Sequence, residues 1–126
     1  MTMPATFTGV TFDVTVELDS TGGASFLYYT PGKDTPSTSN SIEVTGPEII
    51  LYRLKSAPDG FRFIGAVSKT PYNGVIEQSF TNPDGDQILL EDLCMDSGSV
   101  SYHLLLSNGS NAMFLMSPDP EVINKN

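Results

Sequence analysis

The sequence predicts an all-β protein, folded as an antiparallel β-sandwich of seven to nine strands. Three observations support this fold class. Apolar and polar residues alternate with a period of two along several segments, and no segment shows the 3.6-residue period of an amphipathic helix. Turn signals such as Asn-Gly and Pro-Asp-Gly recur at spacings of roughly ten residues. Short strands at this spacing bury their apolar sides when two sheets pack face to face.

The clearest strand spans residues 10–18, where every second side chain is apolar: Val10, Phe12, Val14, Val16 and Leu18. The residues between them are Thr, Asp or Glu, as expected for a strand with one face in water. Turn residues at 19–23 then lead into a second strand over 24–30. Segment 31–41 is rich in Pro, Ser and Thr, has little to bury, and is predicted to be a loop.

Further strands are predicted over 41–45, 48–55, 61–69, 75–80, 87–91, 100–106 and 112–116. Segments 48–55 and 61–69 flank an Ala-Pro-Asp-Gly turn, which predicts that they pair as a hairpin. Pro118 and Pro120 lack the amide donor that a sheet needs, so we expect strand pairing to stop there and residues 121–126 to fray. Residues 1–126 are predicted to form a single domain.

The surroundings of Tyr102 favour an immunoglobulin-like arrangement of the strands. Tyr102 follows Asp96 and Gly98 near the start of a predicted strand. In such sandwiches a tyrosine at this place bonds its hydroxyl to backbone at a corner. The spacing here is two residues longer than usual, and the Trp of antibody domains is missing. An ordinary core position for Tyr102 and a closed barrel are the alternatives.

The charge balance excludes several partners. The chain has 15 acidic and 6 basic residues and a net charge of −9. Nucleic acids and anionic membranes are bound through Lys and Arg, so we expect neither as a partner. No apolar run approaches the roughly 18 residues of a transmembrane helix, and the N-terminus has no signal-peptide pattern. A lone cysteine suits a reducing compartment, so a cytoplasmic location is expected.

The residues also limit catalysis and cofactor chemistry. His103 is the only histidine, and it falls at an outward-facing strand position. Cys94 is the only cysteine, and we expect it to be a small buried apolar residue. Neither lies in a nucleophile motif, and no glycine-rich phosphate loop precedes a helix. We therefore expect no enzymatic activity and no cofactor.

An acidic turn offers an alternative function, the binding of Ca²⁺ or another small ligand. Residues 82–86 (Asn-Pro-Asp-Gly-Asp) place oxygens at alternate positions, although Leu93 stands where an EF-hand needs its last ligand. A sandwich could bring this loop near another acidic loop. The candidate metal ligands are Asp84, Asp86, Glu91 and Asp92. A third alternative, a hydrolase with a carboxylate pair, is disfavoured because most acids occupy solvated strand or turn positions.

The basic residues are unevenly placed and suggest an interaction surface. Four of the six lie within the predicted hairpin of residues 48–69: Arg53, Lys55, Arg62 and Lys69. Such a surface could contact a protein partner or an acidic face of a second copy, giving a homo-oligomer. Alternatively, edge strands carry Lys and Arg to block unwanted pairing. The function favoured by the sequence is therefore a non-enzymatic protein that acts by protein–protein contact or self-association.

The end of the chain resembles a known family. Residues 117–125, Ser-Pro-Asp-Pro-Glu-Val-Ile-Asn-Lys, are similar to the tail of the DP-EP proteins, small bacterial proteins without an assigned activity. The Asp-Pro element is present as Asp119-Pro120, whereas the Glu-Pro element is replaced by Pro-Glu at 47–48 and 120–121. The resemblance implies a bacterial source and supplies no catalytic or binding residues.

Overall fold

The computed structural model describes residues 8–21, 23–30, 32–68, 70, 72–76, 78–109 and 114–125. Ten strands and no helix are found in this part of the chain, so none of its segments is a helix that could cross a membrane. The strands are β1 (Thr8–Leu18), β2 (Ala24–Tyr29), β3 (Ser41–Val44), β4 (Glu48–Ser56), β5 (Arg62–Ser68), β6 (Gln78–Thr81), β7 (Gln87–Asp92), β8 (Gly98–Ser107), β9 (Phe114–Met116) and β10 (Glu121–Asn124).

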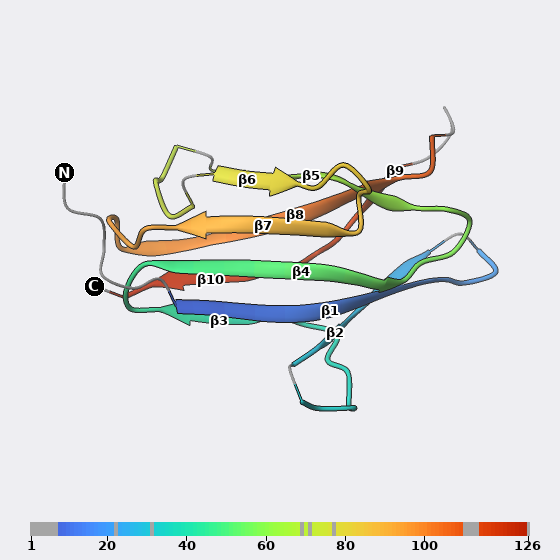
Figure 1. Cartoon of the computed structure of the whole chain (residues 1–126), viewed down its shortest axis with the longest axis horizontal. Coiled ribbons are helices and arrows are strands. Elements are labelled where there is room, and N and C mark those ends of the chain that lie inside the picture. Colours follow the sequence, from blue (N-terminus) through green and yellow to red (C-terminus); the bar gives the residue numbers. More distant parts are fainter. Residues whose placement is uncertain are drawn as a thin grey trace.

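The strands form two sheets that lie one behind the other (Figure 1). The first sheet has the order β2-β1-β4-β7-β6, and the second has the order β3-β10-β8-β5, with β9 also pairing with β8. The prediction of an all-β chain is confirmed. The prediction of purely antiparallel sheets is wrong, because β1 runs parallel to β4 and β3 runs parallel to β10. Between β2 and β4 the chain passes through β3 in the second sheet, and β4 then pairs in parallel with β1. The immunoglobulin-like arrangement stays a prediction.

The two sheets enclose the apolar core. On β1, the side chains of Phe12, Val14 and Val16 are buried, as the two-residue alternation predicts. Tyr52 of β4 stacks on Phe12 with ring centroids 5.6 Å apart, and its hydroxyl donates to Asn40 Oδ1 at 2.5 Å. Tyr28 of β2 donates to the Asp119 carbonyl oxygen at 3.0 Å. Burial raises the pKa of both tyrosines, so they stay neutral donors in the core.

The predicted hairpin of residues 48–69 does not form. β4 pairs with β1 and β7 in the first sheet, whereas β5 pairs with β8 in the second. The turn between them is present: the Phe61 amide donates to the Pro58 carbonyl at 3.1 Å, and Asp59 and Gly60 both have positive φ. After the turn, Phe61 and Phe63 are buried in the core as the chain passes into the second sheet. The Ala-Pro-Asp-Gly signal therefore predicted the position of the turn correctly, but it did not predict which strands β4 and β5 pair with.

The predicted fraying of residues 121–126 is wrong for Glu121–Asn124, which form β10 between β3 and β8, whereas residue 126 lies outside the described residues. Pro118 and Pro120 lie in a short gap between β9 and β10. Both of these strands pair with β8, so the prolines interrupt the pairing along β8 but do not end it. Across this break, the Leu104 amide donates to Ser117 Oγ at 2.7 Å, and the Tyr102 amide donates to the Pro120 carbonyl at 2.7 Å. A side-chain hydroxyl thus replaces the missing backbone partner, and the chain re-enters the sheet.

Tyr102 of β8 lies close to Ser79 of β6, and the predicted corner stays a prediction. A hydrogen bond with the side chain of Ser79 on β6 lowers the pKa of Tyr102, but burial has the larger effect and raises it overall. β6 belongs to the first sheet and β8 to the second. Tyr102 is therefore half-buried between the two sheets. This position resembles the alternative prediction, an ordinary core tyrosine.

Candidate functional site

The outer face of the second sheet carries both a pocket and exposed apolar side chains. Along β8 the side chains of Val100, Leu104 and Leu106 point into the core, so the alternate residues between them face outward. The outward residues of β8 change character along the strand, from Ser99, Ser101 and His103 to Leu105 and Ser107. Ser99 and Ser101 pair with β10, His103 pairs with Val67 of β5, and Leu105 and Ser107 pair with β9.

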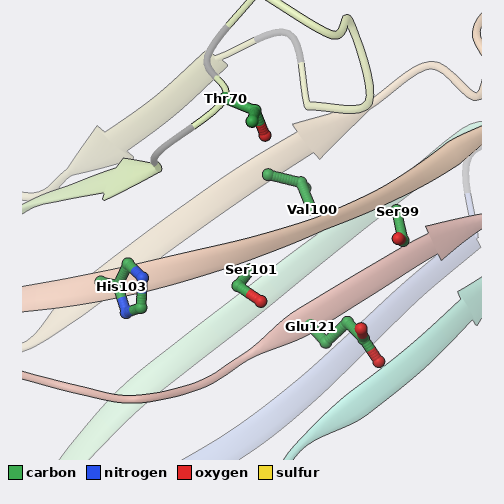
Figure 2. A pocket seen from close by; sticks show the side chains of 6 residues that line it. All are labelled: Thr70, Ser99, Val100, Ser101, His103 and Glu121. Atoms are coloured by element: carbon green, nitrogen blue, oxygen red, sulfur yellow. The ribbon is translucent and has the colours of Figure 1, made fainter.

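The polar end of this face contains an open pocket of about 320 Å³. Its lining residues come from β8, from β10 and from the loop after β5: Thr70, Ser99, Val100, Ser101, His103 and Glu121 (Figure 2). Glu121 and Ser101 are direct neighbours across the β10–β8 pair. The loop is fastened over β8 by Asn73, whose Nδ2 donates to the Ser99 carbonyl at 3.0 Å. Two paired strands therefore form the floor of the pocket.

His103 connects the pocket to the Asp-Pro motif. Its Nδ1 lies 2.7 Å from the Ser117 carbonyl oxygen. A carbonyl can only accept, so Nδ1 carries a proton and donates it, which leaves Nε2 outside this hydrogen bond. Burial raises the pKa of the nearby Asp119 carboxyl, the Glu121 carboxylate raises it further, and His103 lowers it. The only histidine of the chain thus lies beside two carboxyl groups.

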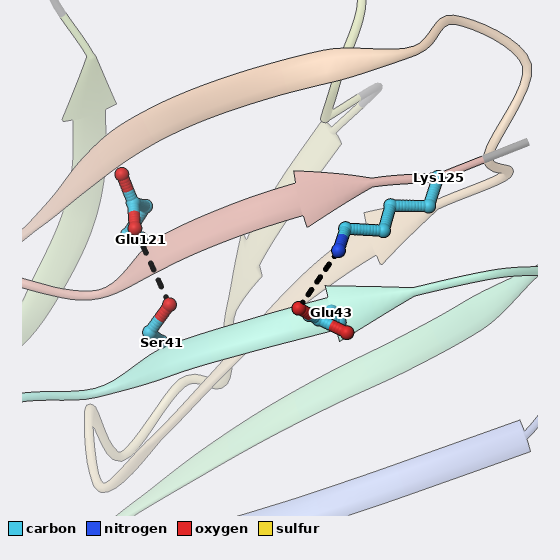
Figure 3. A network of polar contacts seen from close by, with 4 residues as sticks. All are labelled: Ser41, Glu43, Glu121 and Lys125. Carbon is cyan, nitrogen blue, oxygen red and sulfur yellow. Dashed lines mark hydrogen bonds and ion pairs between the residues drawn. The ribbon is translucent and has the colours of Figure 1, made fainter.

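Polar contacts tie the edge strand β3 to β10 beside the pocket (Figure 3). Ser41 Oγ donates to Glu121 Oε1 at 3.3 Å, and Lys125 Nζ lies 3.0 Å from Glu43 Oε1. Both partners of the Lys125–Glu43 pair are more than half exposed, so the pair adds little stability. One carboxylate oxygen of Glu121 therefore accepts a hydrogen bond from Ser41, a residue outside the pocket lining.

The other end of the face is apolar and exposed. Ile64 and Val67 of β5 are 49% and 43% exposed, and Phe114 and Met116 of β9 are 66% and 57% exposed. Leu105 lies between the two strands, because it pairs with Gly65 on one side and with Met116 on the other. We call these five side chains the apolar face: Ile64, Val67, Leu105, Phe114 and Met116.

The four predicted metal ligands are not brought together. Asp84 and Asp86 lie in the turn before β7, and Asn82 Nδ2 donates to Asp86 Oδ1 at 2.5 Å. Glu91 and Asp92 lie at the opposite end of β7, roughly 15 Å away for a strand of this length, and on opposite faces of the sheet. Asp92 is fully buried and accepts a hydrogen bond from the Cys94 amide at 2.8 Å. Among the described residues, no three acidic, His or Cys side chains are grouped to hold a metal ion.

The predicted basic surface is divided between the two sheets. Arg53 and Lys55 lie on the outer face of the first sheet, and both have partners there. Arg53 Nε is 2.8 Å from Asp13 Oδ1, and Lys55 Nζ is 4.6 Å from the centre of the Tyr29 ring. Arg62 belongs to β5 in the second sheet, and Lys69 lies outside the described residues. The three described positions, Arg53, Lys55 and Arg62, do not form one continuous basic patch.

Glu121, Phe114 and Met116 are not among the site residues predicted from the sequence. Residues 121–126 are predicted to fray, and a frayed segment has no strand partner. The pairing of Glu121 with Ser101 is therefore not expected from the sequence. Phe114 and Met116 are alternate residues of segment 112–116, so their side chains lie on the same side of the strand. This alternation does not say whether that side faces the core or the solvent. Their register with β8, whose Leu106 is buried opposite Leu115, decides it.

Fold and surface define an all-β protein of two facing mixed sheets, in which four of the seven exposed large hydrophobic side chains of the described residues lie on one outer face. The chain belongs to the DP-EP family, whose family model matches residues 10–126. Its structure is similar to the crystal structure of the inclusion body protein PixA from Burkholderia cenocepacia J2315, with a TM-score of 0.50 and 9% identity over 98% of this chain and 99% of that one. A comparison with curated proteins gave no match.

Proposed function

We propose that this chain is a non-catalytic bacterial cytoplasmic protein that self-associates through the apolar face. The observation that carries the proposal is the clustering of exposed apolar residues. Of the seven large hydrophobic residues that are exposed in the described part of the chain, four belong to this one face. Clustered apolar surface of this kind marks an interaction site, whereas isolated exposed apolar residues are ordinary.

The charge distribution favours a second copy as the partner. β5, β8 and β9 contain no Asp or Glu, although the chain has 15 acidic residues. A net charge of −9 makes two copies repel each other wherever their carboxylates meet. The apolar face is a surface on which they can approach without such contacts. A basic partner, in contrast, would be attracted to the acidic surfaces elsewhere.

The geometry of the face suits a symmetric contact. Two-fold symmetry places the same patch of each copy against the other, which the five uncharged side chains of the apolar face allow. Gly65 leaves open space beside Leu105, since a Cβ there would meet no atom within 4 Å. A protruding side chain of the second copy fits such a gap. The PixA structure is described as an inclusion body protein, and we transfer only the idea of self-assembly to this chain.

Light scattering coupled to size-exclusion chromatography tests the proposal. Wild type should form a concentration-dependent dimer or larger assembly, strengthened by added salt, which screens the net charge. Phe114→Ser should weaken association at least tenfold, because burying an aromatic ring contributes about 1.5–3 kcal/mol.

Phe80→Ser is the matched control. Phe80 is 51% exposed on β6, in the other sheet, so its replacement should leave association unchanged. A wild type that stays monomeric at high concentration and high salt would refute the proposal. Equal weakening by both substitutions would refute the assignment to the apolar face.

A further inference from the structure

We infer that the pocket beside His103 is a binding site for a small hydroxylated amine, of the amino-sugar or amino-alcohol class. The inference does not rest on self-association, because a single chain supplies every lining residue (Figure 2). Three features lead to it: a rigid floor, hydrogen-bonding groups without a use in the fold, and a lining that excludes other ligands.

The floor is formed by paired strands and not by a loop. Ser99, Ser101 and His103 are successive outward residues of β8, and Glu121 is the β10 neighbour of Ser101. Each strand is paired on both sides, β8 with β5 and β10, and β10 with β8 and β3. Side chains on such strands keep their spacing without a ligand, so binding would not require the site to be assembled.

Several polar groups around the pocket have hydrogen-bonding capacity that the described part of the fold does not use. No hydrogen bond within the described residues engages the hydroxyls of Ser99 and Ser101. Glu121 Oε1 accepts from Ser41, which leaves Oε2 for another donor. The Nδ1 contact of His103 with the Ser117 carbonyl leaves Nε2 as an acceptor in the neutral ring. A carboxylate oxygen, a ring nitrogen and two hydroxyls thus surround one space.

The lining defines the chemical class of the ligand. None of the described lining residues is Lys or Arg, so a phosphate or carboxylate ligand would meet Glu121 without a compensating charge. Among the described lining residues only Val100 is apolar, so a hydrophobic ligand gains little. An ammonium group is the natural partner of Glu121, and ligand hydroxyls suit the two serines and the ring nitrogen. A volume of about 320 Å³ is at the small end of ligand pockets and suits a monosaccharide-sized molecule.

Nuclear magnetic resonance with glucosamine tests the inference directly. His103 is the only histidine, so its ring C–H signals report on the pocket alone. At fixed pH, glucosamine should shift these signals in a saturable way. Glucose, which has a hydroxyl in place of the ammonium group, should bind at least tenfold more weakly, and glucose 6-phosphate should give no saturable shift.

Two substitutions separate the pocket from the rest of the face. Glu121→Gln removes the carboxylate charge and should weaken glucosamine binding at least tenfold. Glu43→Gln is the matched control, because Glu43 lies on the same side of the sheet but pairs with Lys125 outside the pocket (Figure 3). Its binding should equal that of wild type.

The absence of a saturable shift at tens of millimolar glucosamine would overturn the inference. So would equal binding of glucose or glucose 6-phosphate, or unchanged binding by Glu121→Gln. Phe114→Ser, the variant with the altered apolar face, should bind glucosamine as wild type does. The two proposals can therefore fail separately.

Discussion

Val122→Ala tests whether residues 121–124 are an internal strand of the second sheet. Val122 is fully buried, and it lies between Ile42 of β3 and Val100 of β8 in the strand register. The substitution removes two methyl-sized groups, worth about 1.6 kcal/mol of transfer free energy. The remaining cavity adds about 1 kcal/mol. The free energy of unfolding should therefore fall by about 2–3 kcal/mol.

Urea unfolding followed by tyrosine fluorescence measures this loss, because the chain has five tyrosines and no tryptophan. Val67→Ala is the matched control: the same substitution in the same sheet, at a residue that is 43% exposed. It should cost less than about 1 kcal/mol when measured at a protein concentration too low for association. If Val122→Ala cost under about 0.5 kcal/mol, as in a frayed segment, the placement of β10 would be refuted.

Three further substitutions test other parts of the fold. Glu48→Gln should raise the melting temperature at neutral pH, because burial and a neighbouring carboxylate raise the pKa of Glu48 above its ordinary 4.5. The gain should vanish well below pH 4.5, where Glu48 is protonated in both states; a gain independent of pH would contradict this cause. Gly85→Ala should lower the melting temperature in calorimetry more than Gly109→Ala does. Both have positive φ, but a Cβ only at Gly85 would lie 2.8 Å from a β5 side chain, and equal losses would refute that clash. Tyr52→Phe should cost about 1–3 kcal/mol in urea unfolding, because it leaves the buried Asn40 Oδ1 without its donor; a negligible cost would rule out that hydrogen bond as a stabilising contact.

The parts of the fold that follow local rules were predictable from the sequence. Alternation alone identified which side of β1 is buried, because neighbouring side chains of a strand always point to opposite faces. It also placed His103 on an outward face. The turn at residues 82–86 joins β6 and β7 as a hairpin, since its Asn and Gly fit a tight reversal.

Strand partners were not predictable, because pairing depends on residues far away in the chain. The Pro-Asp-Gly turn after β4 looks the same whether the next strand returns to the same sheet or crosses to the other. The prolines before β10 indicated an end to pairing, but a hydroxyl from Ser117 fills the gap in the ladder. Glu121 and Met116 gained their places in the pocket and on the apolar face only through these pairings.

The parallel pair of β3 and β10 has a consequence for the kinetics of folding. Ser41 pairs with Glu121, so a long stretch of intervening chain must be ordered before β3 gains its neighbour. Closing so long a loop is entropically costly, and chains dominated by distant pairings fold slowly. Until then, β3 is a short strand with an open edge, and its charged Glu43 discourages premature pairing with other chains.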